Sequence, residues 1–176
     1  MKAKLSLGLF ILCCPMVLWA HGPTPQKANE SVLINAPIAK VWELLRKFEK
    51  ISLWHPDLKD SLGDGKKEEP RVRTLVMQNN EQVTEEMDFF SDQDHEYGYR
   101  LKTENVKALP VSSYTVKIQA TPGEAGQTTV VSAKSRFYRG DTGNTPPESL
   151  NDEAATKAMS AFFKNGLQGL KQTLEK

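Results

Sequence analysis

Most of the chain alternates between apolar and polar residues, but helical spacing replaces this alternation near the start and at the end. Residues 31–35 alternate, with Val32 and Ile34 on one face, and predict a short strand. Pro37 ends the alternation, because proline donates no hydrogen bond to a sheet but suits the first turn of a helix. Apolar residues then follow at helical spacing until Pro56 prevents further helix. The segment predicts a strand, a helix, a short second helical piece and a new strand.

Beyond residue 56 the apolar positions recur at every second residue, as in strands with one buried face. Turn-forming pairs such as Asn79-Asn80 and Pro122-Gly123 separate the alternating stretches. The predicted strands are residues 57–62, 71–77, 82–90, 96–103, 111–120 and 128–138. Regular short strands with turns between them predict an antiparallel meander.

The last part of the chain predicts one long helix over residues 148–174. Acidic Asp152 and Glu153 lie near its start and Lys171 lies near its end, as the helix dipole favours. Its apolar residues form a single face, which needs a surface to cover it. The sheet is the available partner, so we predict an α+β fold. A curved antiparallel sheet of about seven strands wraps around the long C-terminal helix, with two short helices after the first strand.

Residues 1–22 have the pattern of a secretory signal peptide. Lys2 and Lys4 precede an apolar run that is too short to span a bilayer as a mature helix. An uncleaved anchor and a lipid-modified cysteine are the alternatives. We therefore expect export of the mature chain across a membrane, with no stable membrane insertion after the signal is cleaved.

Cleavage would leave a flexible leader over residues 23–29 and a single domain over residues 30–176, roughly 155 residues together. Both cysteines, Cys13 and Cys14, would leave with the signal, which excludes disulfides and cysteine metal sites. Loss of the two signal lysines takes 23 basic residues to 21 against 22 acidic ones, a net charge of about −1. Balanced, interspersed charge gives no reason to expect nucleic acid as a partner.

Strand alternation also predicts which side chains point to the inner face of the sheet. The polar ones are informative. Glu85 stands between Val83 and Met87, where an unpaired carboxylate is costly, and Lys59 and Arg73 are candidate partners on neighbouring strands. These charges either hold the polar end of a ligand or form a structural ion pair that closes the barrel. A one-residue bulge would turn part of a strand over and change these assignments.

Other polar side chains have the same two interpretations. Trp54 and His55 either line the mouth of a pocket or pack the second helical piece onto the sheet. Tyr97, Tyr99 and Tyr114 either orient a ligand with their hydroxyls or are ordinary core tyrosines. The sequence contains no nucleophile motif with an orienting partner and no metal-ligand spacing. It therefore predicts no metal and no cofactor.

Several segments occur in an order that resembles the helix-grip superfamily. They are INAPIAKVWELLRKFEKISLWHP, RVRTLVM, VTEEMDFFSDQDHEYGYRL, LPVSSYTVKI, SRFYRG and GLQGLKQTLE. This superfamily includes START lipid-transfer domains, the birch-pollen allergen and the polyketide cyclase/dehydrase-like proteins. Within it the chain looks most like periplasmic MxaD-type proteins, which are associated with methanol oxidation.

The resemblance implies a cavity between the sheet and the C-terminal helix that holds a small apolar or amphipathic ligand. In plant hormone receptors of this superfamily an inward lysine and glutamate hold the polar end of the ligand. The residues expected to contact a ligand are Lys59, Arg73, Glu85, Met87, Phe89, Tyr97, Tyr99, Tyr114, Val116, Ala133, Phe137, Phe162 and Phe163, with Trp54 and His55 at the pocket mouth.

Three functions follow from the resemblance. The first is a periplasmic, non-enzymatic protein that binds a small apolar or amphipathic molecule. The second is an accessory protein that contacts a periplasmic quinoprotein dehydrogenase or its cytochrome. The third is a polyketide cyclase or dehydratase, which export disfavours because such intermediates are normally handled inside the cell.

Overall fold

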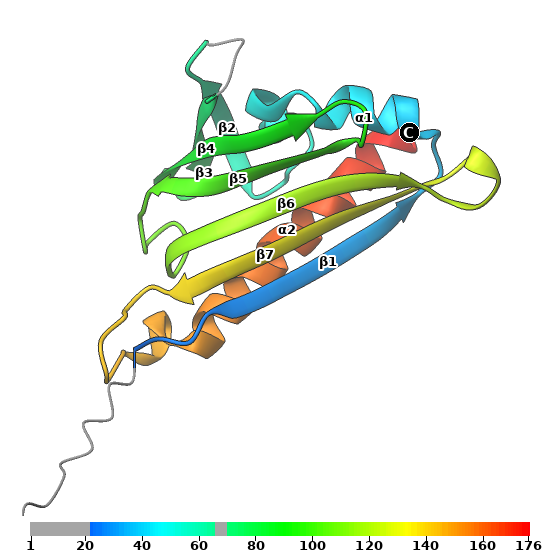
Figure 1. Ribbon diagram of the computed structural model, residues 1–176. Coiled ribbons are helices and arrows are strands. Elements are labelled where there is room, and N and C mark those ends of the chain that lie inside the picture. The colour runs from blue at the N-terminus through cyan, green and yellow to red at the C-terminus, as the bar shows by residue number, and fades with distance from the viewer. Residues whose placement is uncertain (1–21, 66–69) are drawn as a thin grey trace, which may run out of the picture.

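Seven strands form one antiparallel sheet in the computed structural model, which describes residues 22–65 and 70–176. The strands are β1 (Gln26–Ile34), β2 (Leu58–Gly63), β3 (Val72–Met77), β4 (Gln82–Ser91), β5 (Glu96–Thr103), β6 (Val111–Pro122) and β7 (Thr129–Arg139). Their order across the sheet is β1-β7-β6-β5-β4-β3-β2, so the first strand pairs with the last. The predicted meander is confirmed, and β1 closes it on one side (Figure 1).

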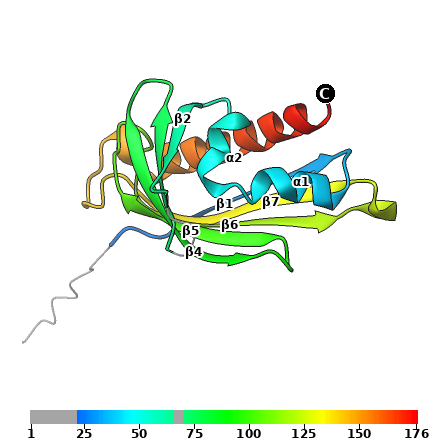
Figure 2. The ribbon, with the colours of Figure 1, turned by 90° about the horizontal axis from the view of Figure 1, so that it is seen from above.

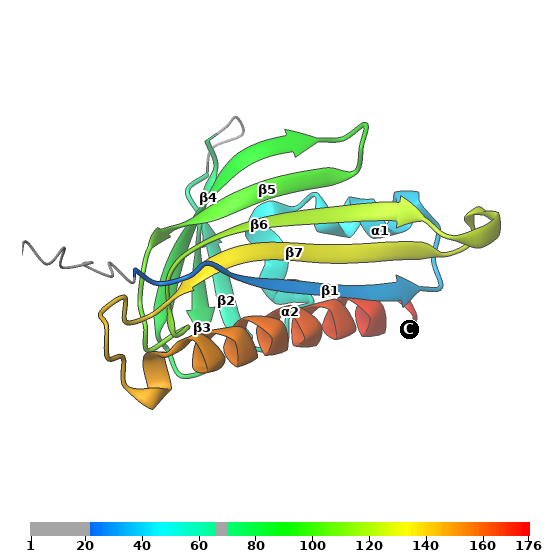
Figure 3. The same cartoon turned by 60° about the horizontal axis from the view of Figure 1, so that its bottom comes forward.

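Two α-helices and three short 3-10 segments accompany the sheet in the part of the chain that the structure describes. They are α1 (Ile38–Leu45), η1 (Phe48–Leu53), η2 (Glu124–Gly126), η3 (Glu148–Leu150) and α2 (Asp152–Leu174). Figure 2 shows α1 and α2 on the same side of the sheet. In Figure 3, α2 runs along the edge formed by β1 and β7. The predicted α+β arrangement of a curled sheet around a long C-terminal helix is therefore confirmed.

The long helix begins four residues later than predicted. Residues 148–150 form a 3-10 turn instead, and Asn151 then caps α2 by accepting a hydrogen bond from the Ala154 backbone N–H at 2.9 Å. This is the usual role of an asparagine at a helix start. The apolar face of α2, from Ala155 to Leu174, is buried against the inner face of the sheet.

The first strand begins at Gln26 and not in the segment predicted from residue 31. Residues 26–30 pair with the end of β7, from Gln26 opposite Phe137 to Glu30 opposite Ala133. The alternation there is weak because Ala28 is its one buried apolar residue. The flexible leader predicted over residues 23–29 is therefore wrong from Gln26 onward. Residues 1–21, where most of the predicted signal peptide falls, lie outside the described residues.

Two β-bulges reverse the predicted orientation of two side chains. The pairing of β2 with β3 steps from Leu58 to Asp60, so Lys59 is the extra residue and its ammonium donates to Asn80 Oδ1 at 2.7 Å in an exposed position. The pairing of β4 with β5 steps from Met87 to Phe89, which places the Phe89 ring on the outer face, 39% exposed. The inward predictions for Lys59 and Phe89 are wrong because a bulge adds one residue to a period of two.

Candidate functional site

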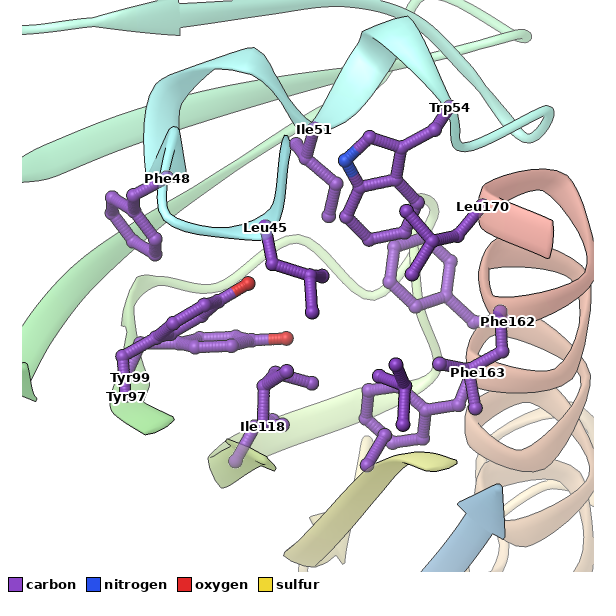
Figure 4. Packing of buried hydrophobic residues seen from close by; sticks show 14 of the residues in the cluster. Leu45, Phe48, Ile51, Trp54, Tyr97, Tyr99, Ile118, Phe162, Phe163 and Leu170 are labelled. Atoms are coloured by element: carbon purple, nitrogen blue, oxygen red, sulfur yellow. The ribbon is translucent and has the colours of Figure 1, made fainter. Parts of the chain in front are cut away.

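A small apolar cavity lies between the sheet, η1 and α2. It encloses about 20 Å³, which is room for about one water molecule. Its walls are Ile51, Trp54, His55, Tyr97, Tyr99, Ile118, Ala133, Phe162, Phe163, Gly166 and Leu167. Figure 4 shows several of these side chains converging on the interior, namely Ile51, Trp54, Tyr97, Tyr99, Ile118, Phe162 and Phe163. In this structure the interior is nearly filled by the protein's own side chains.

His55 contributes a buried polar group to this wall. Its Nδ1 accepts a hydrogen bond from the Asp57 backbone N–H at 3.3 Å, so in the neutral ring the proton belongs on Nε2. The Nε2 atom is buried against α2 near Phe162 and Gly166 and has no hydrogen-bond partner among the described residues. Burial lowers the pKa of His55 from 6.5 to about 4, and Arg73 adds to this, while Asp57 and the Phe162 backbone oppose it. His55 is therefore a neutral N–H donor that approaches the Phe162 backbone without reaching hydrogen-bond geometry.

Two glycines allow His55 and Trp54 to lie directly against α2. A Cβ on Gly166 would collide with the His55 ring, and a Cβ on Gly169 would collide with the backbone carbonyl oxygen of Trp54. The His55 ring also lies 4.1 Å from the Phe162 ring, measured between centroids. The two glycines of the Gly-Leu-Gln-Gly sequence on α2 therefore let the segment that follows η1 pack directly against the helix.

Tyr97 and Tyr99 form the opposite wall of the cavity. Both come from β5, and Figure 4 shows their hydroxyls pointing toward the space bounded by Leu45 and Ile118. Burial raises the pKa of both hydroxyls, that of Tyr99 well above its ordinary value, so both remain protonated. They are hydrogen-bond donors at neutral pH.

A buried ion pair lies behind these tyrosines. Arg73 Nε donates to Glu85 Oε2 at 2.5 Å, and Arg73 Nη1 donates to the Phe48 carbonyl oxygen at 2.7 Å. The Tyr114 hydroxyl donates to the other carboxylate oxygen of Glu85 at 2.7 Å. The guanidinium is also stacked, with its carbon 3.9 Å from the Phe48 ring centroid and 4.7 Å from that of Tyr99.

The ion pair is fully enclosed, with Arg73 and Glu85 each 1% exposed. Burial alone would lower the pKa of Arg73, but the Glu85 carboxylate more than compensates and raises it, so the guanidinium stays charged. Both oxygens of Glu85 already accept hydrogen bonds, which leaves it poorly placed as a free base. Arg73 Nη2 has no hydrogen-bond partner among the described residues. The geometry favours the structural interpretation, in which these charges join β3, β4 and β6.

The predicted ligand contacts therefore fall into three groups. The residues that line the cavity are Trp54, His55, Tyr97, Tyr99, Ala133, Phe162 and Phe163. The residues that point inward but lie behind the cavity wall are Arg73, Glu85, Met87, Tyr114, Val116 and Phe137. Lys59 and Phe89 point outward, as described above.

The expected contacts do not include four members of the wall, which are Ile51, Ile118, Gly166 and Leu167. Ile118 lies on the inner face of β6, but alternation does not show that it meets the cavity. Ile51 belongs to η1, whose short irregular turn gives no clear period. Leu167 belongs to the predicted apolar face of α2, but that face alone does not identify which of its residues line a cavity. Gly166 lies one turn after Phe162, and this spacing was the available signal for a close approach.

A wider groove of about 350 Å³ lies on the far side of Phe162. It is bordered by the β3–β4 turn at Gln78 and Asn79, by Leu109 before β6, and by Ala158 on α2. Phe162 lines both this groove and the inner cavity. A single aromatic ring therefore forms part of the wall between the interior and a surface groove.

Within residues 22–65 and 70–176, no three side chains of the His, Cys, Asp and Glu types are grouped so as to hold a metal ion. Across the same residues, no helix combines the length and apolar character needed to cross a membrane.

Residues 25–175 match the protein family described as polyketide cyclase / dehydrase and lipid transport. A search of curated proteins finds no match. Among solved structures, the chain is similar to XoxI from Bacillus cereus, with a TM-score of 0.71 and 25% identity, over 85% of this chain and 96% of that one.

Two further solved structures share the fold. An uncharacterised protein from Bacillus thuringiensis has a TM-score of 0.71 at 24% identity, over 86% of this chain and all of the other. The Zhui aromatase/cyclase from Streptomyces has a TM-score of 0.65 at 16% identity, over 86% of this chain and 94% of that one.

Proposed function

The chain belongs to the polyketide cyclase / dehydrase and lipid transport family, and on this premise we propose that it binds a small apolar or amphipathic molecule between the sheet and α2 without transforming it. The cavity walls are mostly aromatic and aliphatic, with a few polar groups, which is the usual composition of a small-molecule site. Glu85 is already held by two donors, so the geometry gives no reason to assign it a catalytic role.

The observation that carries this proposal is the buried His55 Nε2–H in the cavity wall, which reaches hydrogen-bond geometry with no acceptor among the described residues. A buried N–H without a partner costs about 1–3 kcal/mol, and a ligand oxygen would remove that cost. The Tyr97 and Tyr99 hydroxyls offer two more donors on the opposite wall. The ligand this wall suits is an apolar body with an oxygen that accepts hydrogen bonds, such as a carbonyl, hydroxyl or carboxylate.

Binding requires the cavity to open, because about 20 Å³ is far below the roughly 300–1,000 Å³ of pockets that hold drug-sized molecules. Rotation of the Phe162 ring would join the cavity to the groove of about 350 Å³ outside it. The groove would then be the access route. Movement of this ring away from His55 would also expose Nε2 to the incoming molecule.

Native mass spectrometry of the gently purified protein tests the proposal. We expect a mass increment that organic extraction removes, and the extracted protein should bind the amphipathic dye anilinonaphthalene sulfonate. Ala133→Val, which adds bulk inside the cavity, should weaken the dye by about tenfold. Ala120→Val is the matched control, since Ala120 is equally buried on the next strand but does not line the cavity. Protein that shows no mass increment and binds no dye would refute the proposal.

The similarity to XoxI supports a second candidate, the accessory role for a periplasmic dehydrogenase or cytochrome that the MxaD resemblance implies. This role predicts genes for a quinoprotein dehydrogenase and its cytochrome beside the gene for this chain, and their absence would remove most of its support. A cyclase or dehydratase is a third prediction, in which Glu85→Gln or Tyr114→Phe abolishes turnover.

Export to the periplasm is part of the proposal and rests on the pattern of residues 1–22. N-terminal sequencing of the protein from a periplasmic extract should give a first residue between His21 and Pro23. Recovery of the protein in the cytoplasmic fraction with Met1 intact would contradict it.

A further inference from the structure

The outer face of the sheet carries a cluster of positive charge that the inner cavity does not use. Lys27 on β1, Lys117 on β6, and Lys134 and Arg136 on β7 all lie at positions that alternate with buried residues. Figure 1 looks onto this face, with α2 behind the strands. We call these four residues the basic cluster.

Strand register places like charges opposite one another. Lys27 of β1 pairs with Arg136 of β7, and Lys117 of β6 pairs with Lys134 of β7. Like charges at directly opposed positions destabilise a sheet. Lys117 has a partner in Glu96 at 2.6 Å, but within the described residues Lys27, Lys134 and Arg136 form no ion pair. The chain therefore keeps an unfavourable arrangement at the centre of an exposed face.

The basic cluster borders a groove of about 320 Å³. Gly98 makes this groove possible. The Phe89 ring lies over Gly98, and a side chain at position 98 would collide with that ring. Phe89 contributes an apolar surface, and Asn29 and Thr115 add hydrogen-bonding groups. The acidic residue in the groove, Asp88, is neutralised by Arg100 at 2.8 Å. The groove is thus positive, partly apolar and open to solvent.

We propose that this groove binds an acidic, extended segment of a partner protein. Side chains two residues apart on a strand lie about 6.6–6.8 Å apart, so glutamates at alternate positions of an extended segment match Lys134 and Arg136. An apolar side chain on that segment can pack on Phe89. The cations border a hollow, whereas binding to the plane of a membrane favours cations that protrude. This inference is independent of the proposed ligand cavity, which lies on the other face.

The test measures binding of a fluorescein-labelled peptide with glutamate at every second position, by fluorescence anisotropy. The wild type should bind it at least about tenfold tighter than the peptide with glutamine at those positions, and added salt should weaken it. The double substitution K134E/R136E should reduce affinity by about tenfold or more. K157E/K164E makes the same charge change on the exposed side of α2 and should leave affinity unchanged.

Thermal unfolding of the same variants shows whether K134E/R136E remains folded. The two carboxylates would face Lys117 and Lys27, so the substitution should raise Tm by about 1–4 °C while it weakens peptide binding. Equal affinity of the wild type and K134E/R136E for the peptide would overturn the proposal. Binding to phosphatidylglycerol vesicles without binding to the peptide would also overturn it, in favour of a membrane surface.

Discussion

His55 couples the stability of the protein to pH through its buried, neutral ring. Its pKa falls from 6.5 in an exposed chain to about 4 in the folded protein, mainly because burial disfavours the charged form. Between these two values the unfolded chain binds a proton that the folded protein does not. The contribution of His55 to stability is therefore complete above pH 6.5 and is lost as the pH falls through this range.

We predict that the free energy of unfolding decreases by about 3 kcal/mol between pH 7 and pH 4 because of this residue. His55→Phe should remove most of that decrease, whatever its effect on stability at pH 7. Urea unfolding at several pH values measures the slope. A variant that keeps the wild-type slope would show that another group causes the pH dependence.

The Arg73–Glu85 pair leads to a different prediction, because its two members stabilise one another inside the core. Arg73→Met should destabilise the protein by about 3–5 kcal/mol, since it leaves the Glu85 carboxylate buried without its partner. The double substitution Arg73→Met with Glu85→Leu should recover most of this loss. Urea unfolding midpoints of the single and double variants measure the difference.

An exposed ion pair on the same sheet provides the control. Arg100 lies 2.8 Å from Glu86 on the outer face, where solvent screens the interaction, so Arg100→Met should barely move the unfolding midpoint. If the double core variant is no more stable than Arg73→Met alone, the large effect comes from lost packing on Phe48 and Tyr99 and not from the unpaired charge.

At the scale of elements, the contact between α2 and the segment after η1 depends on glycine. Replacing glycine by alanine inside a helix normally stabilises it by about 1 kcal/mol. Gly169→Ala should instead destabilise the protein by about 1–3 kcal/mol, because the new methyl group collides with the Trp54 carbonyl oxygen and the Pro56 ring. Lys164→Ala, at an exposed position of the same helix, should change stability little. Thermal unfolding distinguishes the two, and a stabilised Gly169→Ala would refute the close contact.

The elements themselves were largely predictable, because hydrophobic period is a local property of the sequence. The predicted boundaries of β5 agree with the structure, and those of β3, β4 and β7 differ by one residue. The failures at Lys59 and Phe89 arise at bulges, where one extra residue reverses the inward face. The early start of β1 was missed because its first residues gain their order from pairing with β7, a contact far away in sequence.

The site was less predictable than the fold, because it depends on distances between elements. Alternation correctly placed Glu85 and Arg73 inside, and charge suggested that they pair. It could not show that Phe48 and Tyr99 would cover the guanidinium and separate it from the cavity. The size of the cavity is likewise set by how closely α2 approaches His55, which depends on Gly166.

At the scale of the whole molecule, the sheet separates two surfaces with different chemistry. The inner face holds the apolar cavity beneath α2, and the outer face carries the basic cluster. Residues that face opposite sides alternate along the same strands, as Ala133 and Lys134 do on β7. Substitutions on one face can therefore be tested with little change to the other, provided that the sheet itself remains folded.

Phe162 is the point at which the inner cavity can meet the solvent, since its ring lines both the cavity and the outer groove. We predict that Phe162→Ala speeds dissociation of anilinonaphthalene sulfonate by about tenfold, because it removes part of the wall through which the dye must leave. Phe163→Ala is the matched control. Phe163 lines the cavity but not the groove, so its loss enlarges the interior without opening this route.

Both alanine variants should lose a similar amount of stability, about 3–5 kcal/mol, because Phe162 and Phe163 are each 5% exposed. Stopped-flow displacement of the dye measures the dissociation rates, and the corresponding leucine variants offer a milder comparison at the same positions. Faster dissociation from both variants would mean that looser packing of α2 controls release. Faster dissociation from Phe162→Ala alone would identify this ring as the barrier. Both variants lose a phenyl ring of the same size, but only Phe162 separates the cavity from the groove.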